Sequence, residues 1–226
     1  MMKFFDYLPK LWQKCDKELF QAIPLEKNHK QWRFTMKNVL LALPIIFFFA
    51  CNDKQINTFT DSRDGKTYKY VQIGEQAWMA ENLNYEANGS KCYGNAPDNC
   101  TKYGRLYTQE GAAEACPAGW HLPNDAEWQK LVDFAGGSQA AGSKLRVKTA
   151  KYSSDEYGFS ALPGGGGGSS DRFEGVGELA GWWSASKDAE NNDAYVRDLR
   201  CYGGGSGVLW FEFGEDGLYS VRCIKD

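Results

Sequence analysis

The sequence predicts an α+β fold in a single domain, with two short helices packed on a twisted antiparallel sheet and with long glycine-rich loops. Three observations lead to this prediction. Aromatic residues make up 15% of the chain and glycines number 25, a composition that disfavours a helical bundle because glycine weakens helix interiors. Two segments carry helix-capping signals. Several short apolar runs alternate with polar residues, as strands do.

The first strands are predicted at residues 66–73 (KTYKYVQI) and 76–79 (QAWM). The two residues between them, Gly74 and Glu75, form the Gly-X turn that is typical of a tight hairpin. Turn-forming residues then predominate from 81 to 105.

Two short helices are predicted next. Thr108 is expected to cap the first helix, with one face made of Ala112, Ala113 and Cys116. Asn124 is expected to cap the second, since Glu127 follows at the spacing of a capping box. Its apolar face is formed by Trp128, Leu131, Val132 and Ala135, and the helix should end at Gly136.

The C-terminal half is rich in glycine and short apolar runs. Residues 164–168 are all glycine, and we expect a long flexible loop there because glycine offers no side chain to pack. Strands are predicted at 181–187 (GWWSASK) and 194–202 (AYVRDLRCY). A closing hairpin is predicted around GEDG, between GVLWFEF and LYSVRCI, with one face formed by Tyr219, Val221 and Cys223.

The N-terminal part contains a short apolar run beside a cysteine. Val39 to Ala50 are twelve uncharged residues, preceded by Met36 and Lys37 and followed by Cys51. Such a run is shorter than the roughly 20 residues of a membrane span but typical of a secretory signal. The segment resembles a bacterial lipoprotein signal, which implies cleavage after Ala50 and lipidation of Cys51; a buried apolar segment or an uncleaved anchor is the alternative.

The expected organisation follows from this signal. We expect an upstream extension over 1–35, a signal peptide over 36–50, a tether over 51–58 and a folded domain over 59–226. Residues 1–51 hold 8 of the 26 Lys and Arg residues and 4 of the 29 Asp and Glu residues. The rest of the chain therefore has a formal net charge of about −7. This negative balance argues against nucleic acid as a partner.

The cysteine count agrees with export. Five cysteines remain when Cys15 and Cys51 are set aside, and an odd number in an exported chain indicates two disulfides and one thiol. Cys92 and Cys100 flank the turn-forming segment YGNAPDN. We therefore expect a disulfide that closes this loop.

Five segments together carry a family resemblance: TDSRDGKTYKYVQIGEQAWMAENLNY, CPAGWHLPNDAEW, GFSALPGG, GWWSAS and YSVRCIKD. In this order, over about residues 59–226, they resemble the Fibrobacter succinogenes major paralogous domain of secreted and surface lipoproteins. HLPNDAEW is also similar to a segment of formylglycine-generating enzymes, whose fold is related to C-type lectin domains. The resemblance implies a C-type-lectin-like domain in which Cys116 is bonded to Cys223, and it leaves Cys201 as the free thiol.

The leading hypothesis for function is a cell-envelope lipoprotein with a non-catalytic binding or adhesion domain. It would be anchored by lipid to a membrane, in the outer membrane or at the cell surface, and would bind a polysaccharide or another surface protein. Flat aromatic faces suit sugars, although alternation along a strand buries about half of such residues and paired tryptophans in a strand belong to a core more often than to a ligand site. The candidate ligand-binding residues are Trp182, Trp183, Asp193, Tyr202 and Trp210.

Two other functions are the alternatives. The first is an enzyme, either an oxidase of the formylglycine-generating type, which would need a second thiolate beside Cys201, or an enzyme of another class. A structural display module would use the glycine-rich loops for variation. His121 is the single histidine beyond the signal, and without a cluster of further ligands we expect it to be structural. No catalytic residue, metal or cofactor is expected.

Overall fold

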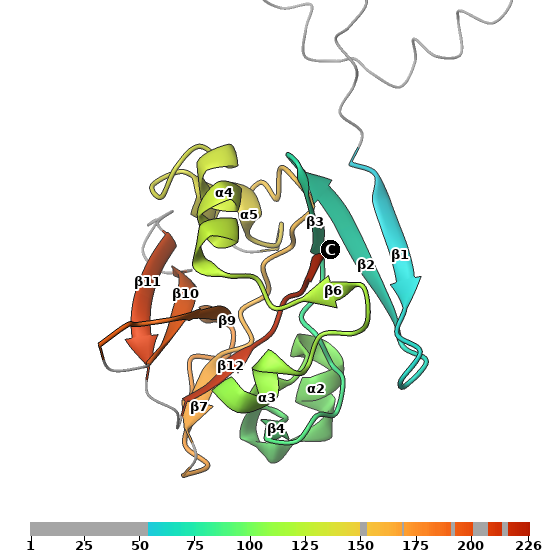
Figure 1. Ribbon diagram of the computed structural model, residues 1–226, viewed down its shortest axis with the longest axis vertical. Coiled ribbons are helices and arrows are strands. Elements are labelled where there is room, and N and C mark those ends of the chain that lie inside the picture. The colour runs from blue at the N-terminus through green and yellow to red at the C-terminus, as the bar shows by residue number, and fades with distance from the viewer. Residues whose placement is uncertain (1–53, 150–152, 169, 191–192, 201–207, 214–216) are drawn as a thin grey trace, which may run out of the picture. The chain divides into compact units, whose positions relative to one another are not determined.

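Strand pairing in the structure, a computed structural model, organises the chain into two sheets (Figure 1). The structure describes residues 54–149, 153–168, 170–190, 193–200, 208–213 and 217–226. Within them, four short α-helices pack on antiparallel sheets, which confirms the predicted α+β class. None of the helices in these residues is long and apolar enough to cross a bilayer.

The first sheet has five strands in the order β1-β2-β3-β13-β6. These strands are β1 (Ile56–Thr60), β2 (Thr67–Ile73), β3 (Gln76–Met79), β13 (Ile224–Lys225) and β6 (Trp120–His121). The predicted hairpin is β2–β3, in which Ile73 pairs with Gln76 and Gly74 has a φ of 58°. β1 begins inside the segment expected to be a tether, because it pairs with β2 from Ile56 onward.

The second sheet follows the order β11-β10-β9-β12-β5-β4. Its strands are β11 (Val208–Phe213), β10 (Ala194–Arg200), β9 (Leu179–Lys187), β12 (Gly217–Ser220), β5 (Leu106–Tyr107) and β4 (Ser90–Lys91). The predicted closing hairpin is wrong: β11 pairs with β10, whereas β12 pairs with β5, β7 and, in parallel, β9. The alternation of apolar and polar residues cannot identify the partner of a strand. In the structure β12 lies between β9 and β5, which both precede it in the sequence.

The C-terminal segment joins the two sheets, since β12 belongs to one and β13 to the other. Tyr219, Val221 and Cys223 share one buried cluster, as their spacing predicts. Cys223 is bonded to Cys116 with an S–S length of 2.10 Å, the pairing that the lectin-like resemblance implies. The expected loop-closing disulfide is also present, between Cys92 and Cys100.

The helices are α2 (Pro97–Tyr103), α3 (Gln109–Ala113), α4 (Asp125–Phe134) and α5 (Ala141–Leu145), with a 3-10 turn, η1, at Tyr93–Asn95. Only α3 and α4 were expected. α2 begins inside the loop closed by Cys92 and Cys100 and ends beyond it, at Tyr103; turn-forming residues hid it from the sequence pattern. Pro97 is compatible with a first helical turn, and Cys100 is the buried residue of this helix.

The capping signals of α3 and α4 are confirmed. Thr108 Oγ1 accepts a hydrogen bond from the Gly111 amide at 3.1 Å. At α4 both bonds of the capping box form, from the Glu127 amide to Asn124 Oδ1 and from the Asn124 amide to Glu127 Oε2. The residues expected on the apolar face of α4 are buried, but Ala113 of α3 is exposed.

The glycine run is packed, which corrects the flexible loop predicted from it. Residues Gly166–Gly168 form β7, which pairs with β12 and with β8 (Phe173–Glu174). A Cβ atom at Gly165 would lie 2.7 Å from the carbonyl oxygen of Glu174 and 2.7 Å from Tyr93 Cε2. The missing side chains therefore allow strands and rings to approach closely.

Two glycines with the same φ of 73° test this packing: Gly165 is enclosed, whereas a Cβ at Gly65 would meet nothing within 4 Å. We expect Gly65→Ala to lower the free energy of unfolding by about 1–2 kcal/mol, the cost of left-handed backbone. Gly165→Ala should cost about 1–3 kcal/mol more because it overpacks the site. Urea unfolding of the full chain measures both, and equal losses would contradict the packing explanation.

A buried polar cluster links the sheets. Asn82, after β3, accepts hydrogen bonds at Oδ1 from Trp182 Nε1 at 2.9 Å and from Arg222 Nη2 at 3.0 Å. Its Nδ2 donates to the Tyr103 carbonyl at 2.9 Å. Arg222 is fully buried, donates to the carbonyl of Phe159 and lies 4.2 Å above that ring.

Removal of the Asn82 side chain should therefore be costly. Asn82→Ala leaves the Trp182 indole and part of the Arg222 guanidinium without an acceptor, and we expect a loss of about 3 kcal/mol in unfolding free energy. Asn84→Ala is the matched control, since Asn84 bonds Tyr68 and Lys66 through backbone atoms. Chemical denaturation should separate the two variants, and similar midpoints would show that the cluster adds little.

Candidate functional site

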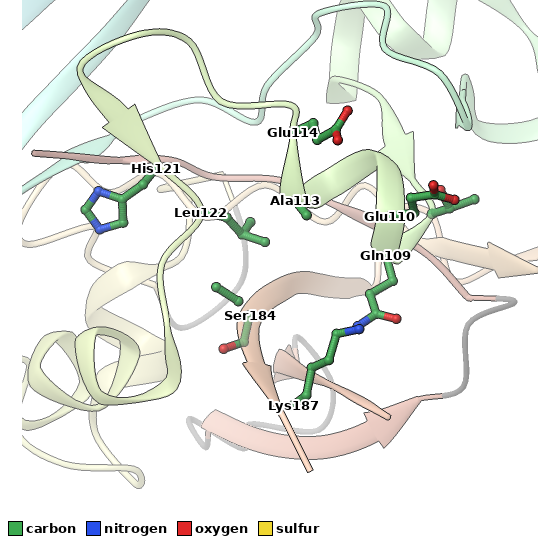
Figure 2. Close-up of a pocket in the computed structure, with 10 residues that line it drawn as sticks. Gln109, Glu110, Ala113, Glu114, His121, Leu122, Ser184 and Lys187 are labelled. Carbon is green, nitrogen blue, oxygen red and sulfur yellow. The ribbon is translucent and has the colours of Figure 1, made fainter. Parts of the chain in front are cut away.

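A surface cleft of about 810 Å³ is the candidate site (Figure 2). Three segments distant in sequence form it: the cap and body of α3, the end of β6, and the last residues of β9. In the view of Figure 2, His121 lies at one end and Gln109 and Lys187 at the other. The lining residues are Thr108, Gln109, Glu110, Ala113, Glu114, His121, Leu122, Ser184, Ala185 and Lys187.

The α3 wall is held by an ion pair from the TDSRDG segment. Arg63 Nη2 lies 2.7 Å from Asp61 Oδ2 and also donates to the carbonyl of Ala115 at 2.7 Å. Burial raises the pKa of Asp61, but the hydrogen bonds from Arg63 outweigh it and hold that pKa below its ordinary value. The guanidinium also stacks 3.7 Å from the centre of the Tyr85 ring. The wall is therefore preorganised.

The β9 wall is tied to the beginning of α4. The Ala185 amide donates to the Pro123 carbonyl at 2.8 Å, and the Asp125 amide donates to Ser186 Oγ at 3.0 Å. Buried Arg197 of β10 donates from Nε to Asp125 Oδ1 at 2.7 Å. These bonds fix the position of Ser184 to Lys187 relative to β6.

His121 is bonded by carboxylates on both sides. Nδ1 lies 2.7 Å from Asp226 Oδ1, and Nε2 lies 3.0 Å from Glu127 Oε1. Partial burial lowers the pKa of His121, but the hydrogen bonds to Asp226 and Glu127 outweigh it, so the pKa is raised. Because Glu127 also completes the capping box of α4, His121 connects the cleft to that helix.

The cleft offers hydrogen bonds of both kinds. Gln109 and Thr108 can donate and accept, Lys187 donates, and Glu110 and Glu114 accept. Ser184 Oγ accepts from the Ser186 amide at 3.2 Å, while both nitrogens of His121 face carboxylates. In the part of the chain that the structure describes, no three His, Cys, Asp or Glu side chains are grouped to hold a metal. The arrangement suits recognition of a polar ligand.

The predicted aromatic platform is wrong for two of its members. Trp182 and Trp183 are 1% and 0% exposed, on opposite sides of β9 in two different core clusters. Their indole groups donate to Asn82 and to the Tyr107 carbonyl. A strand covered on both faces cannot present either ring to a ligand.

The remaining predicted residues are not brought together in the described structure. Asp193 is half-buried at the start of β10, where its carbonyl accepts from the Asp188 amide at 2.8 Å, and it does not line the cleft. Cys51, Cys201, Tyr202 and the side chain of Trp210 lie outside the described residues.

Sequence reasoning missed most of the cleft. Gln109, Ser184 and Lys187 belong to no recognisable motif, and only the tertiary fold brings α3 beside β9. One signal was present: GWWSASK changes from buried tryptophans to small and charged residues at its end. That change marks where β9 emerges from the core.

The raised pKa of His121 predicts how a variant should respond to pH. Protonated His121 donates to both carboxylates, so its contribution to stability is complete below its unfolded pKa of about 6.5. It is lost as pH rises through the higher folded value. His121→Gln should therefore lower the urea midpoint more at pH 5.5 than at pH 8.5. Gln129→Ala, on the exposed side of α4, should change the urea midpoint by the same amount at both pH values. If His121→Gln also changes the midpoint equally at both pH values, the interpretation is refuted.

Comparison with known proteins identifies the family. The model described as the Fibrobacter succinogenes major domain matches residues 71–225, more than half of the chain. No curated protein and no solved structure matches, so the likeness to C-type lectin domains stays a prediction. The matched range contains the cleft and both disulfides. The chain therefore belongs to the Fibrobacter succinogenes major domain family.

Proposed function

We propose that this protein is a cell-envelope lipoprotein, anchored through Cys51 at the outer membrane or cell surface, whose domain binds polysaccharide without catalysis. One observation carries the binding role: the cleft of about 810 Å³, lined by mixed hydrogen-bonding side chains. This volume lies within the range of ligand sites, roughly 300–1,000 Å³.

The chemistry of the cleft favours a sugar chain. Hydroxyl groups both donate and accept, and Thr108, Gln109 and Lys187 supply partners for both roles. Leu122 and Ala185 provide small apolar contacts between these polar groups. Because the ring edges of sugars are polar and their faces weakly apolar, this mixed surface complements them. Another surface protein is the alternative partner.

The envelope location is supported by chemistry on both sides of Cys51. The signal-like segment over 36–50 precedes it, and two disulfides in the domain are typical of an oxidising compartment. The negative charge beyond residue 51 disfavours nucleic acid.

The two other functions receive less support. An oxidase would pair Cys201 with a second thiolate, but the four cysteines in the described residues are joined in disulfides. A display module would vary its glycine-rich loops. Gly164 to Gly166 are buried and enclosed by neighbouring atoms, so that stretch tolerates little variation.

The proposal predicts that cleft side chains control binding. We expect Gln109→Ala combined with Lys187→Ala to weaken binding of the purified full chain to its polysaccharide about tenfold, because two hydrogen bonds are lost. Lys130→Ala, on the exposed face of α4, is the control that should bind normally. Retention on insoluble polysaccharides and glycan arrays, followed by titration with the best oligosaccharide, provides the measurement. The polysaccharide role fails if nothing is retained or if the double variant binds as the unchanged chain does.

A further inference from the structure

Two large apolar side chains are exposed in the described part of the chain, Ile56 at 56% and Phe134 at 51%. They come from the start of β1 and the end of α4. Figure 1 shows these two ends at the same end of the domain, beside the turn between β2 and β3. Single exposed apolar residues are common on protein surfaces, so their shared location is the observation to explain.

Phe134 packs against the turn between β2 and β3. A Cβ atom at Gly74 would lie 2.9 Å from Phe134 Cδ2, and the ring of Tyr157 is 5.3 Å from that of Phe134. Ile56 pairs with Val71 of β2, the strand that leads to this turn. We call the end of the domain that carries Ile56, Phe134 and Tyr157 the apolar end.

The length of chain before β1 limits where a lipid at Cys51 can lie. Ile56 follows Cys51 by five residues, and five extended residues span at most about 18 Å. From Ile56 onward the chain is fixed by pairing with β2. A domain of this size is about 40 Å across. The anchor therefore brings the apolar end close to the bilayer and keeps the opposite end away.

We propose that the apolar end rests on the membrane surface, with Ile56 and Phe134 in contact with the lipid interface. This inference depends on the anchor at Cys51 in the proposed function. Lys54 is exposed nearby, and its Cδ lies 3.5 Å from the Cβ position of Gly158, so its amine can reach lipid phosphates.

The charges at this end limit the depth of contact. Glu75 and Asp133 are exposed beside the apolar residues, and carboxylates are costly to remove from water. The contact is therefore with the headgroup layer and not with the hydrocarbon core. Because α3 lies at the opposite end of the domain in Figure 1, its wall of the cleft is directed away from the membrane.

Photo-crosslinking in membranes tests this orientation. Benzoylphenylalanine is placed at position 134 of the full chain, and at position 113 as a matched control, because Ala113 is exposed on α3 at the far end. After expression and membrane isolation, we expect lipid adducts to be at least fivefold more abundant at 134. Equal yields at the two positions, in a membrane-bound protein, would overturn the proposal.

A longer tether provides the second test. Twenty Gly and Ser residues inserted between Asn52 and Asp53 raise the spacing from Cys51 to Ile56 about fivefold. The effective concentration of the apolar end near the lipid should then fall about tenfold, and adducts at 134 should fall with it. Unchanged adducts would show that the short tether does not set the orientation.

Lipid labelling separates this inference from the proposed function. If the unchanged chain takes up a lipid label that Cys51→Ser abolishes, the anchor is established and the adducts at 134 alone decide the orientation. If no label is incorporated at Cys51, the anchor fails, and the inference falls with it.

Discussion

The fold depends on the buried contact of Asn82, Trp182 and Arg222. Asn82 follows β3 of the first sheet, Trp182 lies in β9 of the second, and Arg222 lies between β12 and β13. One amide group just beyond the first sheet therefore bonds the second sheet and the segment that joins the two. Burial lowers the pKa of Arg222 to about 9, yet the guanidinium stays charged at neutral pH. A buried charge needs its acceptors in fixed places. The polar cluster thereby fixes the position of one sheet relative to the other. Apolar packing alone would define that position less precisely, because it is not directional.

The positions of the two cleft walls follow from how the sheets are placed. Once β9 is fixed at Trp182, its last residues emerge beside Pro123 and the start of α4, where hydrogen bonds from the Ala185 and Asp125 amides hold them. The opposite wall, α3, is held by Arg63 and ends close to Cys116, whose disulfide leads to the C-terminal segment. Both walls are thus attached to the same central strands. A ligand would therefore meet a surface that is already ordered, and the free-energy cost of ordering the site on binding would be small.

The start of β1 and α3, one wall of the cleft, lie at opposite ends of the domain (Figure 1). With the proposed anchor at Cys51, the short spacer before β1 would favour one orientation, in which the apolar end faces lipid and α3 faces outward. The α3 wall of the cleft would then be open to surface polymers, while Ile56 and Phe134 would be covered by the membrane. The same geometry gives a physical reason for the positions of Ile56 and Phe134, which the core does not use.

Local chemistry was readable in the sequence: the Gly74 turn, the Asn124 capping box, the Cys92 loop and the α+β class all depend on neighbours within a few residues. The pairing of β12 with β9, the packing of Gly165 and the burial of Trp182 and Trp183 depend on segments far along the chain. For the same reason the cleft could not be predicted, since α3 and β9 share no motif. Periodicity determines which face of a strand is apolar, whereas only the tertiary structure decides what covers that face, because long-range packing selects among partners that are locally equivalent.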